Sequence, residues 1–350
     1  MHMTYLKILH QGEMPESMIW YRKKLEGCHC AGGGDYWMYL KKGTTDQLLF
    51  FFVGGGFFWN QEMADLPGSL FTTMNNIPAF YTDEAQPNNE FWFFENPGNN
   101  GIFSLDQWNA FRDWNMVMVN YGTGDMHIGQ SEFNHGNQFL HQHGYDNFKA
   151  VLQESPGFFP NPSKLLIAGE SAGAFAVPAL ADDVIQAYRY CKDITVYSDA
   201  AVLTNEDWPR IVSEVWHAPS LIADACHSSN IVLDLYQKLH EKYGNTIRYL
   251  FSCGIGDEAL AALQNYVAWN CFHGSNTARL QTAYAVLHQA SQLEQLGFCT
   301  YLHCFRNNGS VQHCTLAENS FHAGYVKGIS PMVWMLDCLN DNAYSIKEDI

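Results

Sequence analysis

The chain has 350 residues, of which 47% are hydrophobic and 15% aromatic. This composition suits a folded core and excludes a disordered or fibrous chain. With 19 basic against 36 acidic residues the net charge is −17, which repels phosphate backbones and anionic lipid, so we expect neither nucleic acid nor a membrane as partner.

The N-terminus gives no sign of export. Its first twenty residues, MHMTYLKILHQGEMPESMIW, are polar throughout and lack the uninterrupted apolar stretch of a secretory signal. The ten cysteines include no C-x-x-C pair, and a chain of this size does not need disulfides. We therefore expect free thiols and a cytoplasmic rather than a secreted protein.

Short apolar runs recur along the chain, each followed by a glycine-rich or polar turn. Their continuous rather than alternating hydrophobicity predicts strands covered on both faces, as in a parallel sheet. Two earlier runs, 4–10 and 35–43, could add an antiparallel edge. The main runs are residues 46–56, 114–125, 164–171, 193–200, 246–257 and 300–309.

Helical patterns lie between these runs. A helix over 275–297 is expected to begin at a Ser275 cap and to end at Gly297. Residues 230–244 and 257–270 predict two further helices, the second with an acidic start that suits a helix N-terminus. The apolar stripe of the first helix is predicted to contain Leu280, Ala283, Tyr284, Leu287 and Ala290, and that of 230–244 to contain Ile231, Leu235 and Leu239.

Alternating strands and helices predict an α/β sheet with right-handed crossovers. We find no internal repeat and no low-complexity linker, so we expect a single domain over residues 1–350. The aromatic stretch of residues 61–108 is interpreted as a long insertion within it.

The segment KLLIAGESAGAFAVPAL carries the strongest local signal. A short apolar strand runs into Gly169-Glu170-Ser171-Ala172-Gly173, and a helix of small residues follows. This is G-x-S-x-G in strand–turn–helix context, the nucleophile elbow of α/β hydrolases, whose glycines let strand and helix pack closely. We predict that Ser171 is a nucleophile and that the N–H of Ala172 faces the same spot.

A nucleophilic serine needs a base and an acid that orients the base, and in this architecture the chain order is Ser, acid, His. Asp257 lies in the turn after one late strand, and His313 lies in the loop after the next. Asp199 is a rival acid because it also follows a strand, and His322 is a rival base nine residues beyond His313. Position alone leaves both choices open.

Residues 51–60, FFVGGGFFWN, place three glycines where this architecture has its second oxyanion donor. Without a Cβ, such glycines let an acyl oxygen approach the N–H groups of Gly56 and Phe57, joined by that of Ala172. A phosphate loop is excluded because no Gly-Lys-Ser/Thr follows, and a dinucleotide loop because G-x-G-x-x-G is absent. We therefore predict an oxyanion hole.

His141 and His143 have the spacing of a possible metal pair. No cysteine or carboxylate pattern next to them in the sequence completes a site. We therefore expect outward-facing imidazoles and no bound metal.

Four segments, taken in order, resemble the pectin acetylesterases, a family of Notum-like serine carboxylesterases. FFVGGGFFWN resembles the family's Gly-Gly-Gly-Trp-Cys loop, and LLIAGESAGAFA resembles its Gly-x-Ser-Ala-Gly-Gly elbow. Residues 121–129 are similar to Tyr-Cys-Thr-Gly-Asp-x-His-x-Gly, and VQHC to a His-Cys segment. Departures are Phe57 and Phe58 in place of Trp and Cys, and Glu170 where Cys often precedes the serine.

The resemblance implies a serine esterase that needs no cofactor, with an α/β-hydrolase-like core made of a mostly parallel sheet flanked by helices. It implies Ser171 as nucleophile, and it favours His313 over His322 as base and Asp257 over Asp199 as the orienting acid. The substrate that it implies is an O-acetyl ester of a carbohydrate.

Three other functions fit parts of the sequence. The aromatic segments FYTDE and FWFFENPG could line a pocket for a longer acyl chain, as in a lipid deacylase. A serine peptidase would use the same three residues. A non-catalytic carbohydrate-binding relative would keep the aromatic residues without a working triad.

Overall fold

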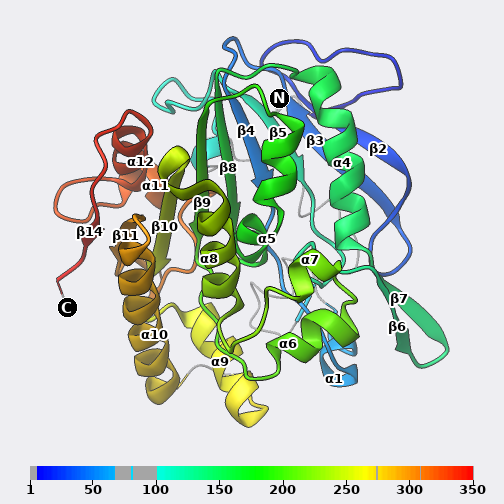
Figure 1. Ribbon diagram of the computed structural model, residues 1–350, viewed down its shortest axis with the longest axis vertical. Coiled ribbons are helices and arrows are strands. Elements are labelled where there is room, and N and C mark those ends of the chain that lie inside the picture. Colours follow the sequence, from blue (N-terminus) through cyan, green and yellow to red (C-terminus); the bar gives the residue numbers. More distant parts are fainter. Residues whose placement is uncertain (1–5, 68–79, 82–100, 273–274, 308, 350) are drawn as a thin grey trace.

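One large sheet runs through the middle of the molecule, and its strands come from both ends of the chain (Figure 1). The computed structural model describes residues 6–67, 80–81, 101–272, 275–307 and 309–349. The sheet contains β1 (Leu6–Ile8), β2 (Trp20–His29), β3 (Asp35–Lys41), β4 (Leu48–Phe52), β5 (Asn115–Val119), β8 (Lys164–Glu170), β9 (Asp193–Asp199), β10 (Arg248–Gly254), β11 (Cys299–His303) and β14 (Ile346–Lys347). Two hairpins lie outside it, β6 (Ser131–His135) with β7 (Gln138–Gln142) and β12 (Arg306–Asn307) with β13 (Ser310–Val311).

The strand order across the sheet is β1-β2-β3-β5-β4-β8-β9-β10-β11-β14. From β5 to β14 all neighbours are parallel, whereas β3 is antiparallel to both β2 and β5. Each of the six main apolar runs holds one of the parallel strands. The fold is therefore α/β-hydrolase-like, with a mostly parallel sheet flanked by helices, and this prediction is confirmed.

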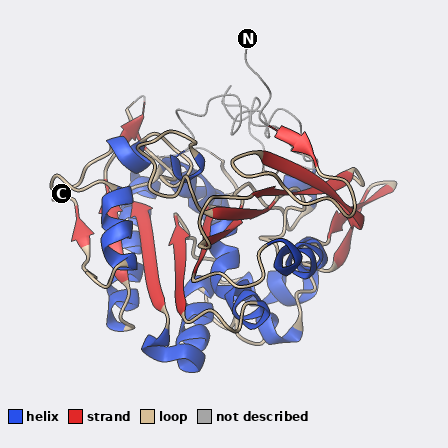
Figure 2. Ribbon diagram, turned by 90° about the horizontal axis from the view of Figure 1, so that it is seen from above, coloured by secondary structure: helices blue, strands red, loops and turns tan. Residues whose placement is uncertain are grey.

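Helices connect the strands and lie on both sides of the sheet (Figure 2). The longest are α4, α5, α8 and α10, which pack on one face, while η2, α11 and α12 contribute to the core on the other. Their bounds are α1 (Gln61–Ala64), η2 (Gly101–Phe103), α4 (Gly144–Phe158), α5 (Ala172–Ala187), α6 (Trp208–Arg210), η3 (Ile211–Val215), α7 (Ser220–Ala223), α8 (Ile231–Tyr243), η4 (Gly244–Thr246), α9 (Glu258–Trp269), α10 (Asn276–Gln295), α11 (Ser320–Ala323) and α12 (Pro331–Leu339).

Strand β4 shows why the apolar runs are continuous. All five of its side chains are buried, and successive side chains of a strand point to opposite faces. Phe50 and Phe52 belong to the core on one side of the sheet, while Leu49 and Phe51 belong to the core on the other. Burial of each side chain contributes roughly 1.5–3 kcal/mol, so a polar residue would be costly at any of these positions.

The predicted antiparallel edge is right for one strand and wrong for the other. Strand β3 is antiparallel to β5, but β1 runs parallel to its neighbour β2. Strand β2 has no counterpart in the sequence prediction, because WYRKKLEGCH mixes charged residues into a strand that is buried on only part of its length.

The helix predicted over 275–297 is α10, and the Ser275 hydroxyl caps it by accepting a 3.0 Å hydrogen bond from the N–H of Ala278. The predicted buried face is right only in part, because Ala290 is buried and Ala283 and Leu287 pack against the core, whereas two other members are exposed. Leu280 and Tyr284 are 73% and 72% exposed, whereas Val286 is fully buried. The helix carries apolar residues on several of its sides, so packing against α9, β10, α8 and β11, rather than periodicity, decides which of them are covered. The other two predicted helices are α8 and α9.

One continuous sheet supports the expectation of a single domain, which stays a prediction. Most of the predicted insertion at 61–108 lies outside the described residues, as do FWFFENPG and all of FYTDE except Phe80 and Tyr81. In the part of the chain that the structure describes, no helix combines the length and the apolar character needed to cross a membrane.

Lys41 at the end of β3 is a fully buried lysine. Its ammonium donates to the carbonyl of Arg112 and lies 5.9 Å from the ring centre of Trp20. Burial lowers the pKa of Lys41 from 10.5 to about 7, because the charged form loses its water without gaining a paired carboxylate.

We expect Lys41→Met to raise the free energy of unfolding at pH 7 by about 1–3 kcal/mol. In the unfolded chain this lysine is protonated below pH 10.5, whereas in the folded chain it is protonated only below about pH 7. The free-energy cost of burying the lysine therefore grows as the pH falls from 10.5 to 7. Thermal unfolding between pH 6 and 10 should show a gain that shrinks towards alkaline pH. The exposed neighbour provides the control, Lys42→Met, and an equal effect of both variants would contradict the prediction.

Candidate active site

Ser171 lies in the sharp turn between β8 and α5, at the carboxyl end of the parallel strands. Its φ of 52° is in the left-handed region, which a serine adopts only under local strain. A Cβ at Gly169 would contact the carbonyl of Gly173, and a Cβ at Gly173 would contact the carbonyl of Phe52 in β4. Both glycines are therefore required for strand, helix and neighbouring strand to approach this closely.

The structure brings Ser171, His313 and Asp257 into one chain of hydrogen bonds. His313 Nε2 lies 2.8 Å from Ser171 Oγ, and His313 Nδ1 lies 2.7 Å from Asp257 Oδ2. A carboxylate can only accept, so Nδ1 carries a proton and Nε2 is free to accept from the serine hydroxyl. The carboxyl group of Asp257 is fully buried, whereas the imidazole keeps 27% of its surface exposed.

Asp257 is fixed by two contacts at once. It follows β10 and caps α9, where its Oδ1 accepts a 3.0 Å hydrogen bond from the N–H of Leu260 while Oδ2 binds His313. An acidic N-cap also interacts favourably with the helix dipole. The acidic start that predicts this helix therefore also holds the carboxylate towards the imidazole.

The two rival residues lie elsewhere. Asp199, at the end of β9, receives hydrogen bonds from the N–H groups of Thr315 at 2.6 Å and Leu316 at 2.9 Å. It therefore anchors the loop that carries His313 without a hydrogen bond to the imidazole itself. The ring of His322 stacks on Trp108 at 3.7 Å between ring centres and makes no described contact with Ser171.

The environment of His313 favours its protonated form. Burial opposes the charge, but the Coulombic attraction and hydrogen bond of Asp257 outweigh it, and the pKa of His313 lies above its ordinary value of 6.5. A base with a raised pKa holds an abstracted proton more strongly.

The three glycines after β4 each meet a different neighbour. A Cβ at Gly54 would lie 3.0 Å from the Cβ of Ser171, one at Gly55 would contact the ring of Tyr121, and one at Gly56 would contact the carbonyl of Phe80. Bare backbone is therefore needed along the whole loop, and Gly54 places the loop beside the serine.

The predicted oxyanion donors have no acceptor within the described part of the chain. Among those residues, no carbonyl or side chain accepts a hydrogen bond from the N–H of Gly56, Phe57 or Ala172. The first N–H groups of a helix have no partner inside the helix, which accounts for Ala172. Within the described residues, these three backbone N–H groups therefore remain without an acceptor.

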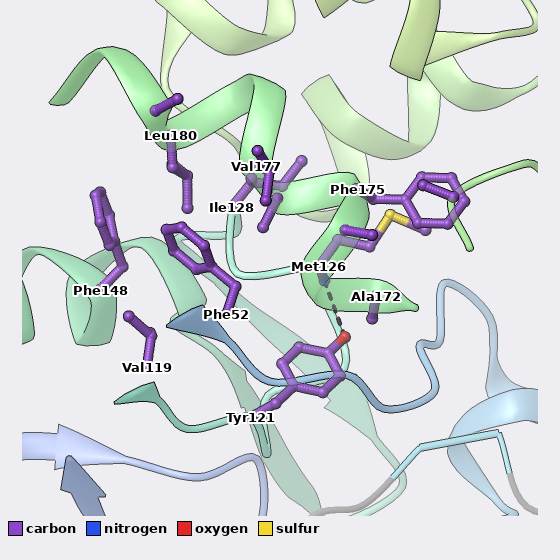
Figure 3. Packing of buried hydrophobic residues seen from close by; sticks show 14 of the residues in the cluster. Phe52, Val119, Tyr121, Met126, Ile128, Phe148, Ala172, Phe175, Val177 and Leu180 are labelled. Atoms are coloured by element: carbon purple, nitrogen blue, oxygen red, sulfur yellow. Dashed lines mark hydrogen bonds between the residues drawn. The ribbon is translucent and has the colours of Figure 1, made fainter. Parts of the chain in front are cut away.

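A second loop, residues 121–129, contacts the backbone just before the three glycines. His127 donates from Nε2 to the carbonyl of Val53 at 2.9 Å, and burial lowers the pKa of His127 to about 4, so the ring is neutral. The N–H of Met126 donates to the Tyr121 hydroxyl at 2.9 Å, close to Ala172 (Figure 3). Residue chemistry alone does not reveal this support, and only the resemblance to Tyr-Cys-Thr-Gly-Asp-x-His-x-Gly draws attention to the segment.

Glu170 and Glu318 are acidic residues that interact electrostatically with His313 and that the sequence analysis did not propose for the site. Burial, followed by the negative charges of Asp199 and Glu318, raises the pKa of Glu170 to about 8. Burial likewise raises the pKa of Glu318 to about 7. Glu170 Oε2 has no hydrogen-bond partner among the described residues, so the carboxyl group is neutral at pH 7.

Glu170, Asp199 and Cys314 also offer possible metal ligands within 4.8 Å of one another. Both oxygens of Asp199 are already engaged, since Oδ1 accepts from Ser252 at 2.6 Å and Oδ2 from the loop of His313. A protonated Glu170 therefore explains this buried cluster better than a cation does.

The model of the pectinacetylesterase family matches residues 15–218, which is more than half of the chain. The chain belongs to this family. A search of curated proteins finds no significant match. The region matched to the pectinacetylesterases includes the glycine loop and Ser171 and ends before Asp257 and His313. Membership implies an esterase that hydrolyses acetyl esters of carbohydrate.

We expect Glu170→Gln to stabilise the protein at alkaline pH but not at pH 5. The folded pKa of about 8 exceeds the ordinary value of 4.5, so the stability linked to this proton is complete below pH 4.5 and is lost as the pH rises through 8. A glutamine stays neutral, and near pH 9 it should gain about 2–4 kcal/mol over glutamate. Thermal unfolding as a function of pH tests this, with the exposed Glu206→Gln as control. A difference from wild type that does not vary with pH would show that Glu170 is already ionised.

Proposed function

We propose that this pectinacetylesterase is a serine esterase that removes O-acetyl groups from a carbohydrate through an acyl-enzyme on Ser171. The observation that carries the proposal is the hydrogen-bond chain from Asp257 through His313 to the Ser171 hydroxyl. It is the arrangement that lets imidazole take a proton from a serine and return it to a leaving group.

The reaction proceeds in two displacements. Ser171 Oγ attacks the acetyl carbonyl while its proton passes to His313 Nε2, and the imidazolium then protonates the departing sugar oxygen. Water next gives its proton to the same nitrogen and attacks the acyl-enzyme, which releases acetate and restores the serine. Asp257 keeps Nδ1 protonated and stabilises the imidazolium in both steps.

The negative oxygen of each tetrahedral intermediate is assigned to the N–H groups of Gly56, Phe57 and Ala172. Their lack of acceptors among the described residues supports this role. One such donor contributes about 10²–10³ in rate. Gly54 packs beside the Cβ of Ser171. The glycine loop that carries two of the donors is therefore held next to the nucleophile.

Aromatic side chains flank the oxyanion loop and bear on the choice of acyl group. Phe57 and Trp59 stack with 5.6 Å between ring centres, and both contact Trp208. Such rings can line a sugar-binding surface or an acyl pocket. The lipid-deacylase alternative therefore differs from the proposal in chain-length preference, and the peptidase alternative in the bond that is cleaved.

Replacement of either triad residue should abolish ester hydrolysis. We expect Ser171→Ala and His313→Ala to lower kcat/KM for p-nitrophenyl acetate by at least about 10³-fold, because neither residue works without the other. The matched control is His322→Ala, which removes a histidine of the same region and should stay within about threefold of wild type. Unfolding temperatures of all variants establish that the fold is retained. Loss of activity in His322→Ala with an active His313→Ala would reverse the assignment.

The acyl preference is tested separately with p-nitrophenyl esters from acetate to decanoate, together with a peptide p-nitroanilide. For a carbohydrate deacetylase we expect serine-dependent turnover that is highest on acetate and negligible on the anilide. A maximum at longer acyl chains would favour lipid deacylation, and serine-dependent cleavage of the anilide would favour a peptidase. No serine-dependent turnover of any ester would favour the non-catalytic relative.

A further inference from the structure

The hairpin of β6 and β7 brings together three side chains that the sequence keeps apart. Glu132 and His141 are directly opposite each other in the antiparallel register. His143 follows β7 and stands immediately before α4. The carboxylate that His141 and His143 lack along the sequence is therefore supplied by the partner strand.

The two separations between Glu132 and the imidazoles are close to those between the ligands of one metal ion. His141 Nδ1 lies 3.0 Å from Glu132 Oε2, and His143 Nε2 lies 3.2 Å from Glu132 Oε1. The possible ligand atoms all lie within 4.8 Å of one another. Two nitrogen or oxygen ligands of a tetrahedral zinc ion stand about 3.3 Å apart, since each is about 2.0–2.2 Å from the metal.

The hairpin backbone that carries these side chains is held in place before any ion arrives. Gln142, next to His141, donates from Nε2 to the carbonyl of Phe58 at 2.9 Å and accepts from Ser131 Oγ at 3.2 Å. The backbone N–H of His141 donates to the carbonyl of Ala31 at 2.9 Å. Little side-chain or backbone order remains to be imposed by binding, which favours affinity.

The cluster is also accessible and chemically suited to zinc. The side chains of Glu132, His141 and His143 are 45%, 29% and 28% exposed, so an ion can enter and keep water on its free positions. Two imidazoles and one carboxylate form a donor set that divalent zinc binds well. The ring of His29 lies 5.9 Å from that of His141.

We propose that Glu132, His141 and His143 form a zinc site that clamps the β6–β7 hairpin to the start of α4. The site contains none of the residues assigned to ester hydrolysis, so the test of this zinc proposal is independent of the proposed function. Its expected consequence is stability of the folded chain, because an ion that binds only the folded arrangement stabilises it by mass action.

The test is a zinc titration of chelator-treated full-length protein, followed by metal content after gel filtration. We expect one tightly held zinc per chain and a rise in unfolding temperature of about 3–6 °C at a hundredfold excess over Kd. Glu132→Gln and His143→Asn should each weaken binding by at least about 100-fold and abolish the thermal shift. Cobalt(II) absorption provides a second readout, which ligand loss should remove in both variants.

The same hairpin offers a matched control. His135 pairs with Asp65 at 2.7 Å and lies outside the cluster, so His135→Asn should bind zinc as wild type does. Wild-type binding weaker than millimolar, or equal binding by wild type and both cluster variants, would overturn the proposal and leave ordinary histidine–glutamate ion pairs. If Glu132→Gln does not fold, His143→Asn alone decides between these outcomes.

Discussion

The candidate site depends on a close approach between three pieces of backbone. The carbonyl of Phe52 at the end of β4 occupies the space that a Cβ of Gly173 would need, and a Cβ at Gly54 would lie 2.7 Å from the carbonyl of Glu170. Only glycine permits this packing. The turn at Ser171 takes a left-handed φ because β8 must reverse into α5 at this contact, and the N–H of Ser171 is held by the carbonyl of Asp199 at 2.9 Å. The serine is positioned by backbone alone, which leaves its hydroxyl free for His313.

A second constraint follows from the number of acidic groups around one imidazole. Asp199 accepts hydrogen bonds from the Ser252 hydroxyl and from the N–H groups of Thr315 and Leu316, and these donors favour its charged form although burial raises its pKa. Glu170 has an oxygen with no donor and lies beside Asp199, so it is the group that keeps a proton. The donors, rather than the mere count of carboxyl groups, decide where the negative charge sits. A neutral Glu170 prevents a further charge next to the nucleophile.

Sequence was sufficient where the determining contacts are local, and it failed where partners come from distant segments. The cap at Ser275 and the contact between Gly169 and Gly173 each depend on neighbours a few residues away, and both appear in the structure. The buried face of α10 could be predicted only in part, because its packing partners in α9, β10, α8 and β11 decide which apolar residues are covered. The proximity of Glu132 to His141 follows from strand register, which no spacing along the chain reveals.

The β6–β7 hairpin contacts the glycine loop through Phe58. The carbonyl of Phe58, one residue beyond a proposed oxyanion donor, accepts hydrogen bonds from Gln142 in β7 and from Trp216 Nε1, both at 2.9 Å. Its N–H donates to Gly124 at 2.9 Å, and its ring lies 5.2 Å from that of Phe133 in β6. The aromatic ring of Phe58 gives the hairpin a contact that a smaller side chain would not make. The hairpin is therefore connected to the residue after Phe57 by one hydrogen bond from Gln142 and one ring contact from Phe133, so its position helps to fix the segment that carries the proposed oxyanion donors.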